Sequence, residues 1–123
     1  MGPEPGLIKG TLDLLILKVV SLEPMHGWGI AQRIQAMSGE TLLVQQGSLY
    51  ASLHRLTREG WITSAWRDTD LGCRARFYTL TETGRAQLDV EISQWTRLSA
   101  GVSRITAAAS PPSTAPAPCR SAS

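Results

Sequence analysis

The chain has 123 residues, of which 42% are hydrophobic, so it has room for one domain with a modest core. Its two cysteines, Cys73 and Cys119, fit a reducing compartment better than a disulfide scaffold, and the formal net charge of +2 is too small to identify a polyanionic partner. No apolar run approaches the length of a membrane span and no secretory signal is visible, so we expect a cytoplasmic protein without a membrane partner.

The first expected element is an amphipathic helix over residues 7–22. Residues 1–6 hold two prolines and two glycines and should form a flexible arm before it. The helix then repeats apolar side chains every three or four positions, in a stripe of Ile8, Leu12, Leu15, Val19 and Leu22. Glu23 precedes Pro24, and a residue before proline disfavours helix, so the helix should end there.

Two further helices follow. One is expected over residues 28–38, with Gly39 as its C-terminal cap and with three inward residues, Ile30, Ile34 and Met37. The next is expected over residues 46–59, ending at Gly60, with an inward stripe of Leu49, Leu53 and Leu56.

A hairpin comes next. Residues 61–67 and 73–80 are rich in strand formers, and residues 68–72 form a turn between them. Arg74 and Arg76 are two positions apart, so they should project from the same face of a strand, which suits contact with phosphates. A solvated edge strand explains either arginine alone equally well. Asp68 and Asp70 near the tip would oppose DNA, which places the expected contact on the second strand.

The last expected element is a helix from Thr81, its N-terminal cap, to about residue 105. Its apolar stripe has a spacing close to 3.5, typical of a helix that packs along another helix, and consists of Leu88, Ile92, Trp95, Leu98, Val102 and Ile105. We interpret residues 81–106 as a dimerisation helix and residues 107–123 as a disordered tail rich in Pro, Ser and Ala. The other three tryptophans, Trp28, Trp61 and Trp66, are expected in the core or at its rim.

This order of elements predicts a mainly α (α+β) fold. Residues 7–80 should form a winged helix-turn-helix domain with a two-stranded wing, and residues 81–106 a long C-terminal helix. Such a domain buries one side of its recognition helix and presents the other to the major groove of DNA.

Three ordered motifs resemble those of PadR-family transcriptional regulators. They are MHGWGI at residues 25–30, QGSLYASLHRLTREGWI at residues 46–62, and RFYTLTETG at residues 76–84. The usual proline after the signature tyrosine is Ala51, a good helix former that suits the same position. The single C-terminal helix resembles the short subfamily. The resemblance implies a homodimeric repressor that binds a palindromic operator and is released by a small hydrophobic effector.

Candidate DNA-binding residues come from the resemblance and from the wing. The resemblance implicates the helix start and the signature tyrosine, with two further candidates on the same helix: Gln46, Ser48, Tyr50, His54 and Arg55. The wing adds Arg74 and Arg76. Residue type alone also allows Tyr50 to pack against the first helix and Arg55 to be solvated. By resemblance, Trp95 is a candidate ligand contact, although an ordinary interface aromatic explains it too.

Catalysis has little support in the sequence. His26 and His54 fall on separate elements, and no phosphate-binding loop or paired-carboxylate motif appears. Cys73 and the histidines lack a zinc spacing. We therefore expect no enzyme activity, cofactor or metal, and we expect double-stranded DNA and a second copy of the chain as partners. Two alternatives are a winged-helix protein-interaction module without DNA binding and a ligand carrier that uses the dimer groove.

Overall fold

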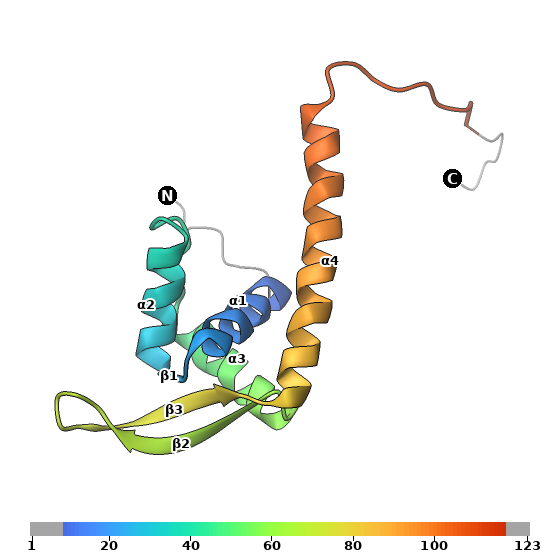
Figure 1. Ribbon diagram of the computed structural model, residues 1–123. Coiled ribbons are helices and arrows are strands. Elements are labelled where there is room, and N and C mark those ends of the chain that lie inside the picture. Colours follow the sequence, from blue (N-terminus) through green and yellow to red (C-terminus); the bar gives the residue numbers. More distant parts are fainter. Residues whose placement is uncertain (1–8, 118–123) are drawn as a thin grey trace.

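The computed structural model describes residues 9–117 and folds them into four helices and one small sheet. Its elements are α1 (Lys9–Leu22), β1 (Met25–His26), α2 (Gly27–Met37), α3 (Gln46–Arg58), β2 (Ile62–Asp68), β3 (Arg74–Leu80) and α4 (Glu82–Ala107). Figure 1 shows α1, α2 and α3 gathered beside the β2–β3 hairpin, with α4 upright at one end and extending far beyond them. The predicted mainly helical winged helix-turn-helix is confirmed. The predicted arm, Ile8 and residues 118–123 of the predicted tail lie outside the described residues.

Helix α1 is the centre of the domain, and its buried surface is wider than the predicted stripe. Six of its apolar residues are buried: Leu12, Leu14, Ile16, Leu17, Val19 and Val20. Leu22, predicted to be inward, is 51% exposed. The reason is that α2, α3, α4 and β3 all pack against α1, so its sides as well as one face are covered.

The helices on either side of the turn follow the predicted pattern more closely. Leu49, Leu53 and Leu56 of α3 are buried, as predicted. Ile30 and Ile34 of α2 are also buried, and Gly39 has a left-handed φ of 68° just after the helix, as a C-terminal glycine should. Met37 was expected inward but is exposed, because it is the last residue of α2 and lies at the edge of the core.

The wing belongs to a three-stranded antiparallel sheet in the order β1-β3-β2. The predicted hairpin is confirmed, with β2 and β3 paired from Ile62↔Leu80 to Asp68↔Arg74. The prediction missed β1, whose two residues pair with Tyr78 and Phe77 of β3. A strand of two residues has no room for an alternating pattern.

The start of α4 fastens the long helix to the wing. Thr81 caps it as predicted, since its hydroxyl Oγ1 accepts a hydrogen bond from the Gly84 N–H at 2.9 Å. A Cβ atom on Gly84 would collide with the carbonyl oxygen of Trp61, so the first turn of α4 lies as close to this residue, which directly precedes β2, as glycine allows. Among the described residues, no helix is both long and apolar enough to cross a membrane.

Leu88 corrects the predicted apolar stripe of α4. Its side chain is only 2% exposed and belongs to the core of its own chain, where α4 packs against α1. It is therefore not available to a partner. The rest of the stripe is exposed: Ile92, Trp95, Leu98, Val102 and Ile105.

Candidate nucleic-acid interface

The two sides of α3 differ sharply. Its three leucines are buried against α1 and the sheet, whereas the predicted DNA-facing residues of its exposed side, Gln46, Ser48, Tyr50 and His54, are open to solvent. Ala51, at the position usually occupied by proline, is exposed too and lies inside the helix. The buried side anchors α3, and the exposed side is free to meet a large partner.

Tyr50 is 47% exposed and lies against Gly27, the first residue of α2. A Cβ atom at Gly27 would lie 2.9 Å from Cε1 and from the hydroxyl oxygen of Tyr50. Gly27, the first residue of α2, therefore has to lack a side chain for the ring to lie there. This contact sets the direction of the ring and leaves much of it exposed.

A groove lies between α3 and the sheet, and we call it the α3–wing groove. Its volume is about 340 Å³, and its lining consists of Tyr50, Leu53, His54, Thr57 and Arg58 from α3 and Ser64, Arg76 and Tyr78 from the hairpin. A smaller hollow of about 190 Å³ beside it shares Tyr50, Arg76 and Tyr78 and reaches His26 and Trp28. Two arginines and no carboxylate line the groove in the described part of the chain, so it favours an anion.

The hairpin carries a second arginine on this face nearer its tip, Arg74, whose register partner is Asp68. Strand alternation and the register place Arg74, Arg76 and Trp66 on one face, which confirms the predicted common face of the two arginines. The guanidinium carbons of Arg76 and Arg74 lie 5.3 and 5.9 Å from the centre of the Trp66 ring. Trp66 is 55% exposed, so this tryptophan is not a core residue. Sequence reasoning missed its association with the arginines.

Arg55 is not part of the groove, although the sequence made it a DNA-binding candidate. Its Nη1 and Nη2 groups donate hydrogen bonds to the two carboxylate oxygens of Asp13 at 2.8 and 2.9 Å, and Nη2 lies 3.4 Å from the Ser52 hydroxyl. Asp13 is buried on α1. The guanidinium therefore joins α3 to α1, because an intramolecular carboxylate already occupies it.

Tyr78 also lines the groove, although the sequence did not predict a functional role for it. It is only 8% exposed, and burial raises the pKa of its hydroxyl above the ordinary value of 10.0, although the nearby cation of Arg76 lowers it and Tyr50 raises it further. The phenol therefore stays neutral at physiological pH. The alternating pattern of the second strand was the signal that could have placed it facing α3.

The described histidine and cysteine side chains, those of His26, His54 and Cys73, lie on separate segments of the chain. His26 caps α2, because its Nδ1 accepts a hydrogen bond from the Gly29 N–H at 2.9 Å. Cys73 is an exposed free thiol next to β3. Within residues 9–117, no three His, Cys, Asp or Glu side chains come close enough together to hold a metal ion.

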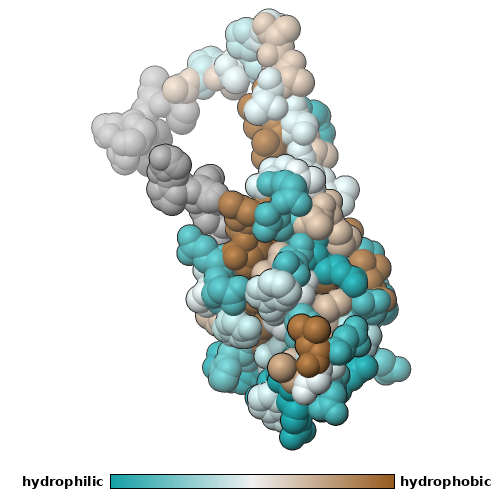
Figure 2. All heavy atoms as spheres, turned by 90° about the vertical axis from the view of Figure 1, so that its left-hand side faces the viewer, coloured by the Kyte–Doolittle hydropathy of each residue, from teal (hydrophilic) through white to brown (hydrophobic). Residues whose placement is uncertain are grey.

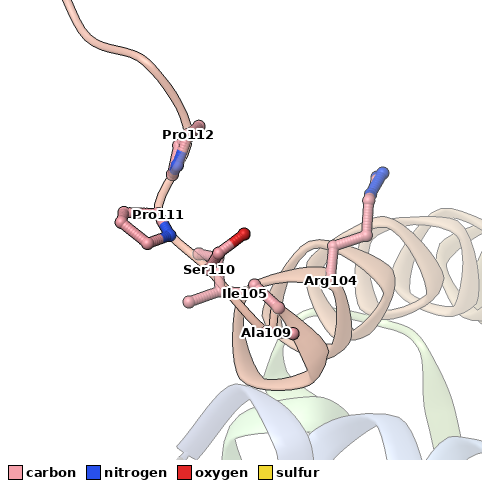
Figure 3. Close-up of a pocket in the computed structure, with 7 residues that line it drawn as sticks. Arg104, Ile105, Ala109, Ser110, Pro111 and Pro112 are labelled. Atoms are coloured by element: carbon pink, nitrogen blue, oxygen red, sulfur yellow. The ribbon is translucent and has the colours of Figure 1, made fainter.

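A third hollow lies at the far end of α4, where the chain leaves the helix. Arg104, Ile105, Ala108 and Ala109 line it together with Ser110, Pro111 and Pro112. Figure 3 shows the two prolines on the segment that leads away from the helix, with the Arg104 side chain pointing away from them. The hollow is open and mostly apolar, and it holds no cluster of reactive groups.

The exposed stripe of α4 is the second surface of interest. It runs up the part of the helix that stands clear of the body, and Figure 2 shows brown and tan, hydrophobic residues among paler ones on this projecting part. Trp95, in the middle of the stripe, is 45% exposed. Apolar side chains in a row on a free helix usually indicate a protein partner.

Comparison with known proteins assigns the fold and the family. The family model for the transcriptional regulator PadR-like family matches residues 16–90. An uncharacterised protein of Lysinibacillus sphaericus is 27% identical over 89 residues, which are 72% of this chain and 82% of that protein.

Two solved structures show the same fold over most of their length. A protein of Streptococcus mutans has a TM-score of 0.74 at 22% identity, covering 85% of this chain and 93% of its own. A PadR-like transcriptional regulator of Bacillus cereus has a TM-score of 0.70 at 25% identity, covering 81% and 95%. With the family model matching more than half of its residues, this chain belongs to the PadR-like family of transcriptional regulators.

Proposed function

We propose that this PadR-like regulator is a homodimeric repressor that binds double-stranded DNA with the exposed side of α3 and the adjacent face of the wing. The observation that carries the proposal is the α3–wing groove, where the exposed helix residues lie next to a cationic strand and no carboxylate intervenes among the described lining residues. The exposed start of α3 adds backbone N–H groups that favour phosphates. Small and polar residues there allow a close approach to base edges.

The wing would supply contacts that do not depend on base sequence. Arg74 and Arg76 lie on the same face as the hairpin part of the groove, and arginine binds phosphate well because its N–H groups are fixed in one plane. These contacts would position α3, and its Ser48, Tyr50 and His54 would then contact base edges in the major groove of the DNA. Arg55 has no place in this interface because Asp13 holds it.

Dimerisation would occur through the exposed part of α4. At 26 residues, α4 has a length of roughly 39 Å at the usual rise per residue, and it extends far beyond the other helices, with its apolar stripe from Ile92 to Ile105 exposed. A second copy would bury Ile92, Trp95, Leu98, Val102 and Ile105 against the same residues of its mate. The twofold pair would present two α3 helices to a palindromic operator.

A small hydrophobic effector would act at this dimer interface. Trp95 is the candidate contact, since it is the aromatic residue of the stripe and remains half exposed in the single chain. Quenching of its fluorescence by a planar aromatic compound, with release of DNA at the same concentrations, would support this role.

The direct test of DNA binding is fluorescence anisotropy with labelled DNA from upstream of the chain's own coding region. The wild-type chain should bind with an affinity that falls steeply with added salt. Tyr50→Ala should weaken binding by roughly tenfold, which is the effect of one good recognition contact, and Tyr50→Phe, which keeps the ring on Gly27, should lose less. Binding that is insensitive to salt and to Tyr50→Ala would favour a winged-helix protein-interaction module instead.

The dimer is tested by light scattering after size exclusion. Leu98→Glu places a charge in the stripe and should give monomers at micromolar concentration. Ala100→Glu is the matched control, because this exposed residue is two positions along and lies on nearly the opposite side of the helix. A wild-type monomer, or equal dissociation by both variants, would contradict the proposed interface.

A further inference from the structure

Packing into the hydrophobic core does not explain where the Trp66 side chain lies. Tryptophan contributes large buried areas to cores and interfaces, yet more than half of the Trp66 surface is open to solvent. Its register partner on β3 is Arg76, and Arg74 is the next residue on the same face. Both guanidinium groups lie within 6 Å of the ring centre, the range in which a cation is attracted to an aromatic face. The ring therefore contacts two cations instead of the core.

The two arginines keep donors available while they lie against the ring. Arg76 donates its Nε–H to the Ser64 hydroxyl at 3.0 Å, which leaves its terminal N–H groups without a protein acceptor among the described residues. The Arg74 side chain forms no hydrogen bond or ion pair in the same part of the chain, although Asp68 is its register partner. A guanidinium can lie against an aromatic ring and still direct N–H groups to an anion.

We propose that Trp66 is a positioning residue for DNA binding. Its ring holds Arg74 and Arg76 side by side, so that both reach the phosphate backbone already ordered. Residues two apart on a strand are separated by about 7 Å, close enough for both to meet one backbone. Each long side chain that is ordered before binding removes part of the entropy loss on association. This inference rests on the proposed function, since it assigns a role within the same interface.

The opposite face of the hairpin offers a matched control. Arg67 lies over the Phe77 ring, with its guanidinium carbon 4.6 Å from the ring centre. In the register, Ala65 and Phe77 pair on this face and Trp66 and Arg76 on the other. Arg67→Ala therefore removes one positive charge and one cation–aromatic contact from the same hairpin without touching the groove side.

The experiment measures the affinity of the full chain for its upstream DNA at one salt concentration. Trp66→Leu should weaken binding by about tenfold, a value set by the ordering of two arginine side chains. Trp66→Phe, which keeps an aromatic face, should recover most of the affinity. In a chain that also carries Arg74→Ala and Arg76→Ala, Trp66→Leu should have little further effect, because the side chains it positions are gone. Arg67→Ala should weaken binding less than Arg76→Ala.

Three results would overturn the role of Trp66 and leave the proposed function standing, provided that wild type binds DNA and Tyr50→Ala binds it about tenfold more weakly. The first is that Trp66→Leu binds DNA as tightly as wild type or more tightly. The second is that Trp66→Leu lowers the affinity as much in the chain without Arg74 and Arg76 as it does in wild type. The third is that Arg67→Ala lowers the affinity as much as Arg76→Ala does. Tighter binding would mean that the arginines must leave the ring to reach phosphate. A wild-type chain that does not bind DNA overturns both proposals. Thermal unfolding confirms that each variant is folded, and Trp66→Thr replaces Trp66→Leu if the leucine variant is not.

Discussion

Replacing Arg55 by alanine removes the two guanidinium hydrogen bonds from the Asp13 carboxylate and leaves that carboxylate buried on α1. Removal of one partner from a fully buried ion pair typically lowers the free energy of unfolding by about 3–5 kcal/mol. Here the side chains of Arg55 and Asp13 are 24% and 12% exposed, so water replaces part of the lost interaction. We therefore expect a loss of about 2–3 kcal/mol, which corresponds to roughly 10 °C in Tm.

Equilibrium urea unfolding, followed by circular dichroism, measures this loss. The protein concentration must be the same for every variant, because dimerisation makes apparent stability depend on concentration. Arg58→Ala is the matched control on the same helix: Arg58 is exposed, forms no ion pair among the described residues, and should change stability by no more than about 0.5 kcal/mol. Asp13→Leu combined with Arg55→Met should recover much of the stability, since it removes both charges together.

The reasoning fails if Arg55→Ala unfolds at the same urea concentration as wild type and binds DNA much more weakly. That result would return Arg55 to the interface, where the sequence places it, and would mean that Asp13 does not hold the guanidinium in solution.

Two further predictions concern the start of α4 and the groove. Gly84→Ala should lower the free energy of unfolding by about 1–3 kcal/mol, because the new methyl group would collide with the Trp61 carbonyl. Gly101→Ala has open space around it and should raise the free energy of unfolding by up to about 1 kcal/mol, because alanine favours helix more than glycine does. Urea unfolding of both variants distinguishes a steric cause from helix propensity. Burial raises the pKa of Tyr78, so the folded state favours the neutral phenol: this contribution to stability is constant below about pH 10 and is lost as the pH rises through the folded pKa. The difference in unfolding free energy between wild type and Tyr78→Phe should therefore shift against wild type from pH 9 to pH 11, and a difference that stays constant would contradict the assigned burial.

Local patterns account for most of the fold that the sequence predicts. The leucines of α3 recur at helical spacing, and Thr81 stands three residues before the glycine whose N–H it binds, so both features can be seen within one segment. The common face of Arg74 and Arg76 likewise follows from the period of a strand. These features are the ones that the structure confirms.

The features that the sequence missed depend on segments that are far apart in the chain. Arg55 meets Asp13 across 42 positions, and nothing near either residue indicates the pair. Leu88 has the spacing of the exposed stripe but lies where α4 crosses α1, which a repeat along one helix cannot reveal. Trp66 has the composition of a core residue, and only the register brings it to Arg76. In each case, the tertiary neighbour decides the role of the side chain.

Hydroxyl-radical footprinting of the full chain on its upstream DNA tests the central claim most directly, because it reports where α3 and the wing shield the sugars. We predict two protected segments whose centres are one helical turn, about 10 base pairs, or a whole multiple of it apart. At a protein concentration just sufficient for wild-type protection, Tyr50→Ala should lose both. A single protected segment, or two that persist in Tyr50→Ala, would contradict a twofold protein that reads DNA with the exposed side of α3.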